Sequence, residues 1–153
     1  MAKNFTLEML SKNIGQQIGQ SNWFLIDQER VNAFAACTND NQWIHTNKEK
    51  AALGPFGDTI VHGFLLLSLI SYFNQEVYRL PPSIKMTINY GINRARFLRP
   101  VLVGSEIKDS IFIKKFTDKG GGKILLETEH NIRVKTDNNP VFVADMLRML
   151  ITL

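Results

Sequence analysis

The chain has 153 residues, of which 44% are apolar and 21% are charged, and its formal net charge is +4. These totals are typical of a globular protein and exclude a disordered one, and the length predicts a single domain covering residues 1–153. The positive charge is small and scattered among acidic residues, so nucleic acid is not an expected partner.

Neither a leader peptide nor a membrane span is expected from the sequence. The opening residues, MAKNFTLEML, contain no long apolar run of the kind that a secretory signal needs. The apolar run FLLLSLISYF is shorter than the ~20 residues that cross a bilayer. Cys37 is the single cysteine, so no intrachain disulfide can form, which fits a reducing cytoplasm. We therefore expect a cytoplasmic protein without membrane contact.

The first elements in chain order are two capped helices on either side of a strand. Thr6 followed by LEML predicts a short helix that the threonine caps. Residues 21–27 (SNWFLID) predict a strand. Asp27 then predicts the cap of a helix through QERVNAFAACT, whose apolar residues recur at helical spacing.

The middle of the chain predicts a buried helix that is reached through a loop. The stretch from Asp40 to His45 has no clear period and predicts a turn or loop. Residues 47–53 predict a short helix, and the Gly- and Pro-containing segment 54–61 predicts a loop. From His62 to about Arg79 the residues favour helix and leave almost no polar face. A helix that is apolar all round is a core helix, so we expect other elements to wrap it.

The second half of the chain predicts long antiparallel strands with one buried face each. Apolar and polar residues alternate through four segments, namely 84–92, 105–116, 123–134 and, less cleanly, 141–151. Such strands, following one very apolar helix, predict an α+β fold in which a curved antiparallel sheet wraps a long central helix.

Asp40 and His45 are candidates for acid–base chemistry. A histidine titrates near neutrality, and a nearby carboxylate can orient it or share a water molecule with it. Taken alone, the two residues favour a simpler interpretation, in which Asp40 is a turn or capping residue and His45 a solvated neighbour.

Gly63 is a candidate for stabilising an oxyanion. It follows His62 in the first turn of the apolar helix, where backbone N–H groups lack intrahelical acceptors and lie at the positive end of the helix dipole. Because glycine has no side chain, a ligand carbonyl can approach this N–H closely. The alternative is that Gly63 only lets the helix begin against the sheet.

Other polar residues have simpler interpretations. His130 falls on the apolar face of its strand and predicts a hydrogen-bonded core histidine. Three arginines near the end of the first long strand could contact phosphates, although a solvated edge is the default: Arg94, Arg96 and Arg99. The histidines and carboxylates show no paired ligands at zinc-like spacing, so we expect no metal site.

Two segments together carry a family signature. Asp40, Ile44 and His45 are followed, after a loop, by IVHGFLLLSL at residues 60–69. This arrangement resembles the MaoC-like, (R)-specific enoyl-CoA hydratases, whose signature is Asp, then Asn-Pro-Ile/Leu-His, a loop, and Ile-Val/Ala-His-Gly before an apolar helix. The segment INYGINRARFLRPVLVGS is similar to the subgroup of nodulation protein N relatives, as is QWIH, in which Gln and Trp replace Asn and Pro.

The resemblance implies a hot-dog fold and a homodimer with an acyl-CoA tunnel near its interface. It also implies that no cofactor is needed, because the CoA enters as part of the substrate. Asp40 and His45 would hold and activate one water, which adds across the double bond of a trans-2-enoyl-CoA to give a 3-hydroxyacyl-CoA. The Gly63 amide would bond the thioester oxygen. The supporting residues would be Gln42, His62 and Ser71.

Three alternatives stay open from the sequence. The same chemistry can run as dehydration of a 3-hydroxyacyl thioester. An acyl-CoA thioesterase of the hot-dog fold would direct water to the thioester carbon, and the Asp40–His45 pair argues against it. A non-catalytic acyl-thioester binding module would keep the tunnel without needing both residues.

Overall fold

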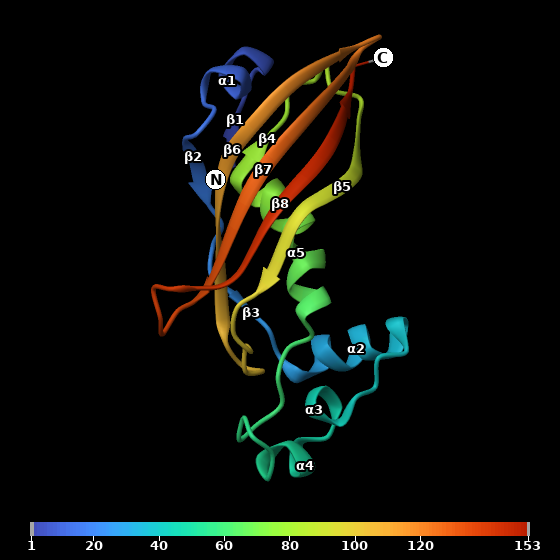
Figure 1. The fold of residues 1–153 in the computed structure, drawn as a ribbon, viewed down its shortest axis with the longest axis vertical. Helices are drawn as coiled ribbons and strands as arrows, with labels where there is room; N and C mark the ends of the chain where they lie inside the picture. The colour runs from blue at the N-terminus through green and yellow to red at the C-terminus, as the bar shows by residue number, and fades with distance from the viewer. Residues whose placement is uncertain (1, 153) are drawn as a thin grey trace.

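A long helix lies against a curved antiparallel sheet in the computed structural model, which describes residues 2–152 (Figure 1). The sheet has the strand order β2-β6-β7-β8-β5, and β3 pairs with β6 off this path. Its strands are β2 (Gln17–Gln20), β3 (Phe24–Leu25), β5 (Met86–Phe97), β6 (Glu106–Gly120), β7 (Lys123–Val134) and β8 (Pro140–Ile151). The long helix, α5, spans Gly63–Val77. The predicted α+β hot-dog architecture is confirmed.

The remaining elements lie at the two ends of α5. The short strands β1 (Lys3–Asn4) and β4 (Tyr78–Arg79) pair in parallel beyond its C-terminal end. The other helices are α1 (Leu7–Lys12), α2 (Gln28–Thr38), α3 (Trp43–Thr46) and α4 (Lys48–Ala52). Figure 1 shows α2, α3 and α4 gathered at the N-terminal end of α5. Within residues 2–152, none of these helices is long and apolar enough to cross a membrane.

Local sequence signals account for where several elements begin. The side chains of Thr6 and Asp27 accept hydrogen bonds from the backbone N–H groups of Met9 and Arg30 at 3.1 and 2.9 Å, so both predicted helix caps are confirmed. Burial alternates along β6 and β7 as the apolar pattern predicts. Their inward residues pack with the buried side of α5 in the core.

Two predictions for the first half of the chain are wrong in detail. The segment 40–45, predicted as a loop, enters the single helical turn of α3, which is too short to show a period in the sequence. The strand predicted over residues 21–27 is reduced to the two residues of β3. Asp27 keeps an extended backbone but lies outside the strand, and its carboxylate caps α2.

Two apolar surfaces that were predicted to be buried are open in the single chain. The sheet covers one side of α5 only, and Phe64 on the other side is 65% exposed. The apolar face of β5 is also open, with Tyr90 62% and Met86 52% exposed. β5 is the edge strand of the sheet, so no further strand of residues 2–152 pairs with its outer side.

His130 lies in a buried polar cluster within the core, as predicted. Its Nδ1 and a carboxylate oxygen of Asp109 on β6 are 2.7 Å apart, and its Nε2 is 2.9 Å from the Thr128 hydroxyl. All three side chains are fully buried. Because water does not reach them, each depends on the others to satisfy its hydrogen-bonding groups.

We expect Asp109→Leu and His130→Leu each to destabilise the fold by about 3 kcal/mol or more, because each leaves a buried polar partner unpaired. The double variant should lose clearly less than the sum of the two, since no unpaired group of the pair remains. Urea unfolding of the four proteins measures this coupling. Strictly additive losses would show that the pair does not act as a unit.

Candidate active site

Three chain segments meet at the N-terminal end of α5. The turn after α2 carries Asp40, α3 carries His45, and His62 and Gly63 begin α5. A single side chain, the imidazole of His62, contacts both of the other segments. The residues that the sequence separates by more than 20 positions are therefore neighbours in the fold.

The His62 imidazole is the link between these segments. Its Nε2–H donates to the backbone carbonyl of Asp40 at 3.0 Å. Its ring stacks on that of His45, with centroids 3.8 Å apart and an interplanar angle of 23°. On another side it packs against Phe34, at a centroid distance of 5.1 Å. His62 is only 2% exposed, so it fixes the geometry of the site from within.

His45 is held with one ring nitrogen available for chemistry. Its Nδ1–H donates to the backbone carbonyl of Ile60 at 2.7 Å, which leaves Nε2 as the nitrogen with a free electron pair in the neutral ring. Burial lowers the pKa of His45 below its ordinary value of 6.5, an effect larger than the opposing one of the Ile60 bond. His45 is therefore neutral at pH 7 and able to accept a proton.

Asp40 places a carboxylate beside the two imidazoles. Its side chain is 51% exposed, and Oδ2 lies 3.9 Å from Nε2 of His62. Asp40, His45 and His62 each offer one potential ligand atom, and these three atoms lie within 4.8 Å of one another. Because hydrogen bonds to water span about 2.8 Å, two atoms at this separation can share one water molecule.

The same three side chains could also surround a metal ion. Two imidazoles and a carboxylate are suitable ligands for zinc and for several other divalent metals. This grouping could not be predicted from the sequence, because residues 40, 45 and 62 do not follow a metal-binding spacing. The expectation that no metal binds stays a prediction, and chelation tests it below.

Gly63 and His45 line the same cavity, which has a volume of about 280 Å³. A Cβ atom at Gly63 would lie 2.9 Å from Cδ1 of Phe97, so the lack of a side chain at Gly63 lets this ring pack closely on the helix start. The backbone N–H of Gly63, in the first turn of α5, has no intrahelical acceptor. The contact with Phe97 fits the interpretation that Gly63 lets the helix begin against the sheet, and the N–H without an intrahelical acceptor fits a role in binding a carbonyl.

Two of the expected supporting residues contribute less directly. Gln42 accepts the His45 N–H through its backbone carbonyl at 3.0 Å, which begins the turn of α3, while its side chain makes no capping hydrogen bond. Ser71 lies two turns further along α5, in a different cavity that Tyr90 and Met146 also line. The structure does not bring Ser71 together with His45.

Gln28 and Thr59 are positioning residues that sequence reasoning missed. The Gln28 side chain donates to the His45 backbone carbonyl at 2.8 Å and accepts from the Thr59 hydroxyl at 2.6 Å. Thr59 immediately precedes Ile60, whose carbonyl holds the His45 ring. Gln28 thus ties α2, α3 and the loop before α5 together. Its role could not be predicted from the sequence, because a glutamine in the first turn of a helix is common and is usually exposed.

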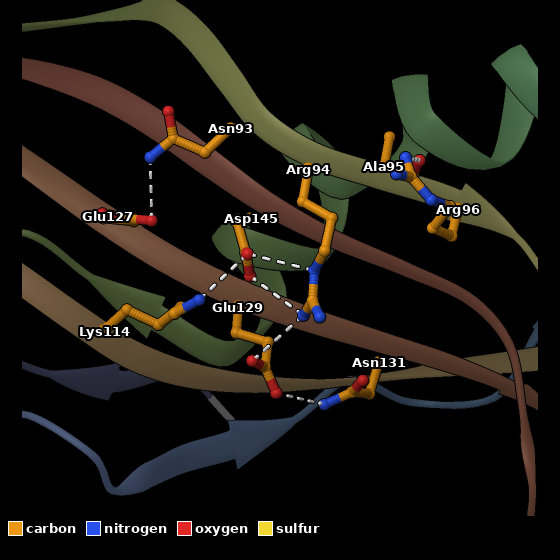
Figure 2. Close-up of polar contacts among 9 residues, drawn as sticks. All are labelled: Asn93, Arg94, Ala95, Arg96, Lys114, Glu127, Glu129, Asn131 and Asp145. Carbon is orange, nitrogen blue, oxygen red and sulfur yellow. Dashed lines mark hydrogen bonds and ion pairs between the residues drawn. The ribbon is translucent and has the colours of Figure 1, made fainter.

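Two of the three arginines considered as phosphate ligands pair with carboxylates instead. Figure 2 shows Arg94 reaching across the outer face of the sheet to Asp145 and Glu129. Lys114 also pairs with Asp145, at 2.9 Å. Arg99 lines the cavity of His45 and Gly63, but its guanidinium already pairs with Asp137. All three arginines are exposed, as expected for a solvated edge, and Arg94 and Arg99 also pair with carboxylates.

A curved sheet on one helix, with an imidazole, a carboxylate and an open backbone amide at the helix start, defines a hot-dog protein with an acid–base site. The family model described as "MaoC like domain" matches residues 10–136. The chain therefore belongs to the MaoC-like domain family, as its sequence predicted.

Similar proteins include enzymes and a nodulation protein. The chain is 39% identical over 138 residues to 3-hydroxyacyl-thioester dehydratase Z of Mycobacterium tuberculosis, covering 90% of this chain and 91% of that protein. It is 34% identical over 149 residues to nodulation protein N of Rhizobium leguminosarum bv. viciae, covering 95% and 91%. The unliganded R-hydratase PhaJ1 from Pseudomonas aeruginosa has a TM-score of 0.71 and 26% identity, covering 92% of this chain and 83% of that one.

We expect the imidazole of His45 to titrate below pH 6.5, because burial disfavours its charged form. Asp40→Asn should lower this pKa further, since the carboxylate favours the imidazolium and its removal takes that effect away. NMR titration of the ring resonances, assigned with a His45→Gln variant, measures both. A His45 pKa above 6.5, or a His45 pKa that does not change in Asp40→Asn, would contradict this description of the site.

Proposed function

We propose that the chain catalyses the reversible, (R)-specific hydration of a trans-2-enoyl-CoA to the 3-hydroxyacyl-CoA. The observation that carries this proposal is that the neutral His45 and the open amide of Gly63 line one cavity, with the Asp40 carboxylate beside them. Membership of the MaoC-like family makes the chain a hydro-lyase. Its relatives include a 3-hydroxyacyl-thioester dehydratase and an R-hydratase, and their names support this reaction class.

Asp40 and His45 provide the acid–base chemistry in this mechanism. They hold one water between them, and Nε2 of His45 accepts a proton as the water oxygen bonds to C3 of the substrate. The electron pair of the double bond moves toward the thioester oxygen, and a proton returns from the Asp40–His45 pair to C2. The product has gained one water. Positioned acid–base groups of this kind accelerate reactions by about 10²–10⁴-fold.

The Gly63 amide stabilises the negative charge that develops during this addition. As water attacks C3, the thioester oxygen takes on the character of an enolate. A backbone N–H at the start of a 15-residue helix donates to that oxygen with the helix dipole in its favour. Since Gly63 has no side chain, the thioester can approach the amide within hydrogen-bonding distance.

A second copy of the chain is part of this proposal. The edge strand β5 exposes five large apolar side chains along its length, namely Met86, Ile88, Tyr90, Ile92 and Phe97. A long apolar edge strand left open is a liability, and pairing with the same strand of a second copy would cover it. Phe97, which packs on Gly63, ends this strand, so an interface along β5 would border the proposed active site.

Purified protein mixed with crotonyl-CoA should remove the ultraviolet absorbance of the conjugated double bond and give a product heavier by one water. Asp40→Asn and His45→Gln should each reduce kcat by about 10²-fold or more, because each removes part of the acid–base pair. Asp118→Asn, near the C-terminal end of β6, serves as a matched control and should keep full activity.

The product distinguishes the alternatives in the same assay. Release of free CoA without water addition would identify a thioesterase, and absence of turnover by folded protein would favour a binding module. Activity should survive EDTA; loss on chelation, with recovery on adding zinc, would show instead that Asp40, His45 and His62 hold a metal ion.

Replacement of Gly63 by proline tests the role of its N–H. Proline removes the N–H, its φ suits the first helical position, and His62 already has the extended backbone that a following proline requires, with φ −59° and ψ 133°. Gly63→Ala places a Cβ against Phe97 but keeps the N–H, so it is the matched control. We expect Gly63→Pro to have a kcat about 10²-fold below that of Gly63→Ala. Equal activities would show that the amide takes no part.

A further inference from the structure

A second cavity, of about 440 Å³, lies at the other end of α5. Asn74 in the last turn of the helix, Tyr78 and Arg79 of β4, Thr87 of β5 and Arg148 of β8 line it. Asn74 follows Gly63 by 11 positions, which corresponds to about 16 Å along the helix axis. The cavity is therefore remote from the proposed active site of the same chain.

The wall of this cavity contains a buried arginine without a partner. Arg148 points to the inner side of β8, between the buried residues Met146 and Leu150, where the strand pattern predicts an apolar side chain. It is 8% exposed, and its Nε and Nη2 have no hydrogen-bond partner within residues 2–152. No carboxylate of the described chain lies within ion-pair distance of it, in contrast to Asp145 on the outer face, which pairs with two cations.

The charge of Arg148 is retained despite this burial. Desolvation lowers its pKa to about 10, so the guanidinium is still protonated at pH 7. Its nearest favourable contact is the face of the Tyr78 ring, with Cζ 5.3 Å from the ring centroid. A cation in such a place needs an anion. Nε and Nη2 form one edge of the guanidinium, the edge that donates side by side to two oxygens of an oxyanion.

Two further polar atoms of the cavity also lack partners. The Tyr78 hydroxyl and Oδ1 of Asn74 are buried and make no hydrogen bond within residues 2–152. The Asn74 amide nitrogen donates to the Ile70 carbonyl at 3.0 Å, which fixes Oδ1 as the free end of that side chain. The ligand must therefore accept from Arg148 and Tyr78 and donate to Asn74.

We propose that this cavity binds a phosphate monoester. A carboxylate has only two oxygens, which Arg148 alone would occupy, whereas a phosphate has further oxygens for Tyr78. Its protonated oxygen can donate to Oδ1 of Asn74. The exposed Arg79 at the rim adds a second positive charge. The volume leaves room for an organic group beside the phosphate.

The phosphate could come from a separate metabolite or from the 3′-phosphate of a CoA thioester. The site itself does not rest on the proposed function, since it is defined by unpartnered groups at the other end of the helix. The experiment begins with inorganic phosphate as the probe and then separates the two sources.

Thermal unfolding of the wild type should show a saturable rise in Tm with inorganic phosphate, compared with chloride and acetate at equal ionic strength and pH 7. Arg148→Met should abolish the rise and should be no less stable than wild type in chloride, because an unpaired buried charge is gone. Arg96→Met, which changes an exposed arginine that bonds only to the Ala95 carbonyl, is the matched control and should keep the response.

Equal Tm of the wild type in phosphate and chloride would overturn the proposal, as would a response that persists in Arg148→Met. If Arg148→Met does not fold, Tyr78→Phe replaces it, and the loss of one hydroxyl should weaken phosphate binding several-fold. A Tyr78→Phe response equal to that of the wild type would likewise count against the site.

CoA and dephospho-CoA then identify the source of the phosphate. If CoA stabilises the wild type more than dephospho-CoA does, and Arg148→Met removes the difference, the 3′-phosphate of the thioester occupies the site. If the two behave alike while inorganic phosphate still acts through Arg148, the site takes a separate phosphorylated ligand. Failure of crotonyl-CoA hydration would leave the inorganic phosphate result untouched, so the two proposals fail separately.

Discussion

The hydrogen bond from His62 to the backbone carbonyl of Asp40, at 3.0 Å, holds the candidate active site together. It joins the start of α5 to the turn after α2, and the stacking of His62 on His45 adds α3 to the same assembly. Since the ring of His62 is buried, water does not compete for the bond. The Asp40 carboxylate, the His45 imidazole and the Gly63 amide keep their relative positions because one buried ring contacts all three segments.

The two ends of α5 use polar groups in different ways. At the N-terminal end, His45 is neutral through burial and its other nitrogen is satisfied by Ile60, so one nitrogen is left for a substrate. At the C-terminal end, Arg148 stays charged and unpartnered within residues 2–152. On the outer face of the sheet, by contrast, the charged Asp145 is paired with both Arg94 and Lys114. Unpaired polar groups thus line the cavity at the C-terminal end of α5, whereas Asp145 on the outer face of the sheet is paired.

Much of this fold could be predicted from local signals, and the rest depended on contacts between distant segments. Neighbouring residues in the sequence determine the caps at Thr6 and Asp27 and the alternation along β6. The exposure of β5 was not predictable, because its apolar pattern is that of a buried strand and only the strand order makes it an edge. The imperfect alternation of β8 was visible in the sequence, but its cause, an inward-facing Arg148, was not.

The site shows the same division. Asp40, His45 and Gly63 were found from a motif, and the fold brings them together at one helix end. Gln28 was missed because its hydrogen bonds to His45 and Thr59 reach residues 17 and 31 positions away. Ser71 was carried over from the family signature, and helix geometry places it two turns away from Gly63, in another cavity.

The most direct test of the account is a crystal structure of Asp40→Asn with crotonyl-CoA bound. We expect the thioester oxygen within about 3.1 Å of the Gly63 amide nitrogen, and C3 facing a water on Nε2 of His45. A thioester that binds with its oxygen turned away from Gly63, or with C3 out of reach of His45, would contradict it.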